Sequence, residues 1–284
     1  MRIAYNGARF HGWQIQPDVR TVQGEVAAVL ARILKRETVK TVGSSRTDTG
    51  VHAHDQRVGF EVDIPIPLSG LRHALERLLP SDIQVLGLVE RPPGFQARFH
   101  AQGKHYGYCI LNPLGIGRLR AFQNLASPFV ADLVSAWAQP LDTDTMHEAA
   151  QALVGTRCFK AMQSAKDQRP HSDTTIYKTR VRRKGALVFF EVVGKHFLYL
   201  MVRNMIGSLI QVGTGEWRVD QFVDYLNNGD RRLMGDTAPA RGLHLFHVFY
   251  EKEALDFTAD GDRFLEFLGS WQQTDAWSRG EGES

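Results

Sequence analysis

The sequence predicts an α+β fold, because a strand-helix-strand-strand-helix-strand order occurs twice between residues 1 and 250. The first copy is expected to have strands at Arg2–Tyr5, Thr38–Val42, Gln56–Val62 and Ile83–Glu90 and helices at Val22–Leu34 and Leu68–Leu78. Apolar Val58, Phe60 and Val62 recur at every second position, as in a half-buried strand. Thr21 is placed to cap the first helix, and Pro80 to end the second.

The second copy begins with a strand at His105–Leu111 and a helix at Thr145–Leu153, for which either Thr145, in a capping box with Glu148, or Thr143 is the expected cap. It continues with a hairpin of Ile176–Arg183 and Ala186–Val193, helices at Leu198–Val212 and Val219–Leu226, and a strand at Leu245–Tyr250. Two such β-α-β-β-α-β halves are of the ferredoxin-like type that RNA-recognition modules also use. We expect halves at residues 1–104 and 105–250, an acidic tail at 251–284 and a surface insertion at Gly115–Pro140.

The composition excludes several classes of protein. Hydrophobic residues make up 43% of the 284 residues, enough for a core. No apolar run reaches the length of about 18 residues that a membrane span needs, and the N-terminus does not resemble a signal peptide. Cys109 and Cys158 are too few for a disulfide framework or a four-cysteine metal site. We therefore expect a soluble, cytoplasmic protein.

The net charge of +3 is unevenly distributed. Residues 251–284 hold nine acidic and three basic side chains, a charge of −6, so residues 1–250 carry +9. A basic body suits a polyanion-binding surface, although an ordinary basic protein has the same composition.

Two segments hold charged residues in unusual settings. Arg46 and Asp48 lie in Gly43–Ala53, a small, polar, turn-prone segment between two expected strands. Such a loop is a common place for functional groups, although an Asx-turn would also explain the aspartate. Arg203 lies in an otherwise apolar helix, where an arginine either extends to solvent or faces a buried anion.

Aromatic and basic residues alternate on two strands. Tyr106 and Tyr108 belong either to the core or to a platform for stacking a base. Lys178, Arg180 and Arg182 share one face of their strand, which is either a solvated surface or a track for RNA phosphates.

Eight motifs in order resemble the tRNA pseudouridine synthase A family and span most of residues 1–250. They are Tyr5-Asn6-Gly7, Phe10-His11-Gly12-Trp13-Gln14, Thr21-Val22-Gln23-Gly24-Glu25, Arg46-Thr47-Asp48-Thr49-Gly50-Val51-His52-Ala53, Phe95-Gln96-Ala97-Arg98-Phe99, Lys104-His105-Tyr106-Gly107-Tyr108, Met201-Val202-Arg203-Asn204-Met205-Ile206-Gly207-Ser208-Leu209 and Ala240-Arg241-Gly242-Leu243.

The resemblance implies a pseudouridine synthase fold, with both halves in one continuous, mostly antiparallel sheet, helices on one face and a basic cleft. It implies a homodimer that isomerises uridines 38, 39 and 40 in the anticodon stem-loop of tRNA. Asp48 matches the catalytic nucleophile, and Arg203 matches the arginine that pairs with it. Arg46 matches the residue that holds the target nucleotide out of its stack, and Tyr106 the aromatic that stacks on the base. The isomerisation oxidises nothing, so no cofactor or metal is expected.

Four departures from the family pattern bear on substrate choice. Asn6 replaces an aspartate, Thr49 replaces an alanine, and His54-Asp55-Gln56-Arg57 replaces a smaller, more apolar run. The Gly115–Pro140 segment is longer than the family pattern leads us to expect.

Two alternatives remain open. His52-Ala53-His54-Asp55 could begin the zinc site of a hydrolase, although no third histidine motif follows. A non-catalytic RNA-binding protein would use the same fold, although binding alone needs no carboxylate in a basic cleft.

Overall fold

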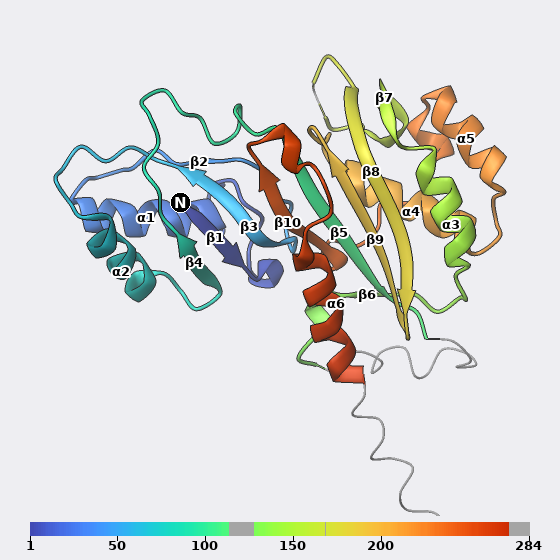
Figure 1. The fold of residues 1–284 in the computed structure, drawn as a ribbon, viewed down its shortest axis with the longest axis horizontal. Helices are drawn as coiled ribbons and strands as arrows, with labels where there is room; N and C mark the ends of the chain where they lie inside the picture. Colours follow the sequence, from blue (N-terminus) through green and yellow to red (C-terminus); the bar gives the residue numbers. More distant parts are fainter. Residues whose placement is uncertain (114–127, 168, 273–284) are drawn as a thin grey trace, which may run out of the picture. The chain divides into compact units, whose positions relative to one another are not determined.

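The computed structural model describes residues 1–113, 128–167 and 169–272 (Figure 1). This part of the chain forms two compact units. Unit 1 comprises Met1–Tyr106 and His244–Leu255, and unit 2 comprises Gly107–Leu243 and the residues from Asp256 onward. Within the described ranges, no helix combines the length and the hydropathy that a membrane crossing requires.

Unit 1 has the strand order β4-β1-β3-β10, and β2 pairs with β3. Its strands are β1 (Arg2–Tyr5), β2 (Val42–Gly43), β3 (His52–Gly59), β4 (Ile83–Gly87) and β10 (Leu243–Phe249, of which Leu243 belongs to unit 2). The β1–β3, β1–β4 and β2–β3 pairs are antiparallel, whereas β10 runs parallel to β3. Helix α1 (Val22–Leu34) packs against α2 (Leu68–Leu78), which also contacts β4.

Helix α1 begins and ends where its sequence predicts. The Thr21 side chain accepts a hydrogen bond from the Gly24 N–H at 3.2 Å, which satisfies one of the first N–H groups of the helix. Buried side chains recur at a spacing of four residues along one face, namely Val22, Val26, Leu30 and Leu34. The helix ends at Lys35, which adopts a left-handed conformation.

Unit 2 contains the strands β9 (Leu187–Gly194), β8 (Asp173–Lys184) and β7 (Gly155–Cys158), which pair antiparallel in that order. Strand β5 (Gly103–Leu111) starts in unit 1 and ends in unit 2, where it pairs in parallel with β6 (Ser135–Ala136). Helix α3 (Thr143–Gln151) packs on β8 and on α4 (Met201–Gly213), and α5 (Val219–Asn228) packs on α3. Helix α6 (Ala259–Gln272) contacts β9.

The fold is mixed α/β, and most of its strand pairs are antiparallel, as expected. Several details of the prediction are wrong. Strand β2 occupies Val42–Gly43 rather than Thr38–Val42, and β7 was not predicted. Strand β3 occupies His52–Gly59 rather than Gln56–Val62, because its first residues pair with β10 and its polar side chains find buried partners. The cap of α3 is Asp142, whose carboxylate accepts from the N–H groups of Asp144 and Thr145.

Two expectations concern residues outside the described ranges. Half of the Gly115–Pro140 insertion, residues 115–127, lies there, as do residues 273–284 at the end of the acidic tail. The domain boundaries at 104 and 250 stay a prediction.

Candidate active site

The Asp48 loop runs from β2 to β3 in unit 1 and is fixed by backbone hydrogen bonds to the segment after β1. The Trp13 N–H donates to the Thr47 carbonyl at 3.0 Å, and the Gly50 N–H donates to the Phe10 carbonyl at 3.3 Å. Within the loop, the Val51 N–H closes a turn on the Asp48 carbonyl at 3.1 Å. Asp48 is half-buried, and its backbone is held from both sides.

Gly12 allows this close approach. It has a φ of +83°, and a Cβ atom there would lie 2.7 Å from the Thr47 carbonyl oxygen and 3.1 Å from the Asp48 carbonyl carbon. Both the left-handed backbone and the lack of space require glycine.

Buried polar side chains hold the start of the loop. The Tyr5 and Thr47 hydroxyls lie 2.7 Å apart, and the fully buried Gln56 amide donates to the Ser45 carbonyl at 2.7 Å. The Gln56 Oε1 atom accepts from the Ser44 hydroxyl at 2.8 Å and from the Ser45 N–H at 3.1 Å. These bonds fix the backbone that leads to Asp48.

Tyr106 lies beside this loop in unit 1 and is the last residue of β5 that belongs to this unit. Its side chain is 7% exposed. Burial raises the pKa of Tyr106 to about 12, the Ser45 side chain opposes the rise, and the negative charge of Asp48 adds to it. Tyr106 thus lies near enough to Asp48 for that charge to affect its pKa, and its role in stacking the base stays a prediction. Arg46, two residues before Asp48, is exposed.

Arg203 belongs to unit 2 and lies in the first turn of α4. Its Nε atom donates to the Ala238 carbonyl at 2.7 Å, and its own carbonyl accepts from the Ala238 N–H at 3.1 Å. The positive charges of Arg203 and Arg241 oppose a rise in the pKa of Tyr108 to about 12 that burial causes. Arg203 is therefore half-buried and anchored to the backbone, rather than extended to solvent. Its pairing with Asp48 stays a prediction.

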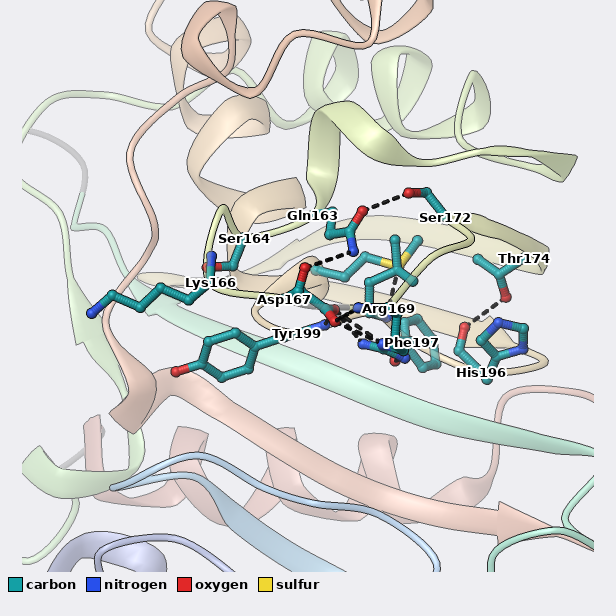
Figure 2. Close-up of polar contacts among 12 residues, drawn as sticks. Gln163, Ser164, Lys166, Asp167, Arg169, Ser172, Thr174, His196, Phe197 and Tyr199 are labelled. Carbon is teal, nitrogen blue, oxygen red and sulfur yellow. Dashed lines mark hydrogen bonds and ion pairs between the residues drawn. The ribbon is translucent and has the colours of Figure 1, made fainter.

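Asp167 fixes the turn that leads into α4, a contact that the sequence did not indicate. Figure 2 shows its carboxylate between Arg169 and the backbone of Tyr199. Oδ2 accepts from the Tyr199 N–H at 2.8 Å and from Arg169 Nη2 at 2.6 Å, and Arg169 Nη1 donates to the Phe197 carbonyl at 3.1 Å. Leu200, which follows, has a φ of +61° that is costly for a non-glycine residue. The carboxylate and the guanidinium thus brace the strained entrance to α4.

The residues considered for a zinc site lie on two faces of β3, because His52 and His54 both contact His244 whereas Asp55 does not. The His52 Nδ1 atom accepts from the Gly7 N–H at 3.1 Å, and its ring stacks on that of His244. Asp55 faces the other way, forms ion pairs of 3.0 and 2.7 Å with Arg2 and Arg57, and lies 2.9 Å from His247 Nδ1. Among the residues that the structure describes, no group of three or more His, Cys, Asp or Glu is arranged to hold a metal.

The three basic residues of β8 contact acidic side chains of their own unit. Lys178 pairs with Asp256, Arg180 with Glu191, and Arg182 with Asp262, at 2.7, 2.6 and 2.5 Å. Their role as a track for RNA stays a prediction.

Comparison with known proteins agrees with the motifs. The profile of the tRNA pseudouridine synthase family matches residues 149–251. The tRNA pseudouridine synthase A of Geobacillus kaustophilus is 37% identical over 253 residues, which are 89% of this chain and 94% of that protein. The enzyme of the same name from Brevibacillus brevis is 38% identical over 87% of this chain and 97% of its own length.

The chain belongs to the tRNA pseudouridine synthase A family. Two of the departures from the pattern of this family have local roles. Asn6 caps the 3-10 turn Gly7–Arg9 by accepting from the Ala8 N–H at 3.0 Å, which an aspartate would also do. Gln56, within the unusual His54–Arg57 run, supports the Asp48 loop. A third departure, Thr49, is exposed beside Asp48.

Proposed function

We propose that this chain converts uridine to pseudouridine at positions 38, 39 and 40 in the anticodon stem-loop of tRNA, as an intramolecular transferase. The reaction breaks a C–N glycosidic bond and forms a C–C bond to the same base. It requires a positioned carboxylate and room for an unstacked base. The observation that carries the proposal is a half-buried Asp48 on a braced loop, close enough to Tyr106 to affect its pKa.

Each predicted residue has a distinct part in this reaction. Asp48 is the nucleophile, and attack on the base or on the sugar would both use its carboxylate. Arg203 pairs with Asp48 and keeps it ionised where desolvation favours the neutral acid. Tyr106 stacks on the uracil and offsets part of the cost of extruding it. Arg46, exposed beside the nucleophile, holds the target nucleotide out of the helix.

The test is release of tritium from transfer RNA labelled at uridine C5. The wild type should release the tritium, and Asp48→Asn should bind the RNA without releasing tritium. Asp63→Asn is the control, because it removes a carboxylate of unit 1 that is exposed and pairs with Arg36. Equal release by Asp48→Asn would remove Asp48 from its role. Binding without release by the wild type would favour the alternative, a non-catalytic RNA-binding protein.

The assembly is a further part of the proposal. In this proposal the chain has two ferredoxin-like halves joined in one continuous sheet. The order β1-α1-β2-β3-α2-β4 in the first half supports it. The chain would act as a cytoplasmic homodimer, with one tRNA touching both subunits. Sedimentation velocity with and without tRNA tests this, since a monomer in both conditions would contradict it.

A further inference from the structure

The outer face of β8 carries a stripe of three cations: Lys178, Arg180 and Arg182. The alternate residues face the other way, since the Thr179 hydroxyl donates to the Ala150 carbonyl of α3 at 2.9 Å and the Thr179 and Val181 side chains are buried. The three cations therefore share the sheet face opposite to α3. We call them the basic stripe.

One acid of the hairpin neutralises part of the basic stripe. Glu191 of β9 is opposite Arg180 in the strand register and has no exposed surface. Its Oε2 atom accepts from Arg180 Nε and Nη2, at 2.8 and 2.6 Å, and lies 3.1 Å from Arg182 Nη2. This contact is internal to the hairpin and fixes both guanidinium groups.

The chain then returns to the basic stripe from its C-terminal end. The C-terminal segment, residues 256–272, places Asp256 Oδ2 2.7 Å from Lys178 Nζ and Asp262 Oδ1 2.5 Å from Arg182 Nη2. Between them, the Arg180 guanidinium lies 4.5 Å from the centre of the Phe257 ring, a cation–π contact. Each cation of the stripe thus faces a residue of the C-terminal segment.

Apolar contacts seat this segment on the hairpin. In α6, Phe264, Leu265 and Leu268 are buried. Gly261 lies directly on the buried carboxylate, because a Cβ atom there would come within 2.5 Å of Glu191 Oε1. Since exposed ion pairs add little to stability, the apolar side chains are what hold α6 in place. Asp256 and Asp262, which are 61% and 49% exposed, mainly neutralise charge.

The charges balance only when the segment is present. The basic stripe carries +3 and Glu191 carries −1, which leaves +2, and Asp256 with Asp262 supply the remaining −2. Both carboxylates occupy the positions, relative to the cations, that phosphate oxygens would take. The segment also lies beyond residue 251, where the match to the family profile ends.

We propose that the C-terminal segment is an intramolecular acidic ligand that competes with the RNA phosphate backbone for the basic stripe. Docked, it keeps RNA off this face of unit 2. Displaced, it leaves two uncompensated positive charges on a rigid strand, a site for single-stranded RNA without sequence preference. The competing ligand rests on the proposed function, because it takes RNA as the polyanion that the chain meets.

Binding of a single-stranded oligouridylate of about 12 nucleotides tests the proposal across a range of salt concentrations. The double variant Asp256→Asn/Asp262→Asn should bind roughly tenfold more tightly than the wild type at low salt. The plot of log affinity against log salt should steepen by about 1.4, the value for two additional phosphates on a single strand. Asp260→Asn is the matched control, since this carboxylate of the same segment pairs with Arg263 and should leave binding unchanged.

A second variant displaces the segment without removing its acids. Phe264→Ser/Leu268→Ser should free α6, which proteolysis after residue 255 would report, and should also tighten RNA binding. Adding Arg182→Gln to Asp256→Asn/Asp262→Asn should reverse part of the increase in RNA affinity. Unchanged affinity and salt slope in both double variants would overturn the proposal. Tritium release from tRNA, measured in parallel, reports on the proposed function separately.

Discussion

The Asp167 carboxylate accepts a hydrogen bond of 2.8 Å from the Tyr199 backbone N–H and so joins two segments of unit 2 that are 32 residues apart. Arg169 completes the contact by binding the same carboxylate and the Phe197 carbonyl. The turn that they hold leads through Leu200, in a left-handed conformation, to the first turn of α4 and Arg203. A residue far from Arg203 in sequence therefore sets the backbone from which this arginine projects.

Asp167→Asn should weaken this brace. One acceptor oxygen and the negative charge are lost, and we expect a cost of roughly 1–3 kcal/mol in the free energy of unfolding, together with a lower kcat. Asp230→Asn is the matched control, because Asp230 binds Arg232 in the same way two residues away. Urea denaturation and single-turnover assays measure both effects. Equal losses in the two variants would mean that the Tyr199 contact does not matter.

The same contact predicts a response to acid. Burial alone would raise the pKa of Asp167, but hydrogen bonds from Arg169 and from the Tyr199 N–H lower it from 3.8 to about 2. A carboxylate whose pKa is lower in the folded chain than in the unfolded chain stabilises the fold at pH values above the unfolded pKa. This contribution is lost as the pH falls toward the folded pKa. The difference in stability between the wild type and Asp167→Asn should therefore be constant above pH 4 and shrink toward pH 2.

Gly12→Ala should damage the Asp48 loop through sterics alone. The new Cβ atom would meet the Thr47 carbonyl oxygen at 2.7 Å, so the loop must shift. Gly94→Ala is the control, since Gly94 has almost the same φ, +84°, with no atom within 4 Å of a new Cβ. Both variants should lose about 1–2 kcal/mol from the left-handed backbone. Only Gly12→Ala should also lose most of the tritium-release rate, and similar rates for both would contradict a tight loop.

Two substitutions of Tyr106 distinguish stacking by its ring from hydrogen bonding by its hydroxyl. Tyr106→Phe keeps the ring and should retain a rate within a few fold of the wild type. Tyr106→Leu removes the aromatic face, and loss of a base stack should cost about 1–3 kcal/mol in tRNA binding or in the rate of the chemical step. Single-turnover kinetics with tRNA distinguish the two. A larger loss for Phe than for Leu would show that the hydroxyl, rather than the ring, is what matters.

Local patterns were sufficient to predict much of the fold. Helices α1 and α2 were predicted at their observed bounds, because their buried residues recur at helical spacing and Thr21 and Pro80 mark ends. Strand β3 was misplaced because His52–Gln56 is polar. Its burial depends on His244, Arg2 and the Asp48 loop, and these are partners distant in sequence that a local window does not contain.

In the candidate site, too, the residues that local motifs mark were predicted, and those that depend on distant partners were not. Asp48 and Arg46 are marked by their motif, and the charge of Asp48 affects the pKa of Tyr106, while the catalytic roles of all three residues stay predictions. Gln56 stood out only as a departure from the family pattern, and its amide proves to bind the Asp48 loop. The brace by Asp167 gave no signal, because its partner is a backbone N–H, and every residue except proline has one.

The histidine pair of β3 and β10 should make unit 1 sensitive to mild acid. His54 Nε2 lies 3.2 Å from His244 Nδ1, so one ring donates to the other and the pair is best satisfied when neutral. Burial, followed by the neighbouring His52 and His105, lowers the pKa of His54 from 6.5 to about 4. The unfolded chain binds a proton near pH 6.5, whereas the folded chain does so only near pH 4. Stability should therefore fall by up to about 3 kcal/mol between these values.

His54→Gln, which does not titrate, provides the comparison. Urea denaturation at intervals from pH 7.5 to pH 4.5 should give a steeper loss of unfolding free energy for the wild type than for the variant. At pH 7.5 the wild type should be the more stable of the two, because its neutral ring fits between His244 and Phe246. The two curves should converge as the pH falls, since only the wild type must keep a buried imidazole unprotonated. Parallel curves would mean that His54 stays neutral in the unfolded chain as well, or is protonated in both states.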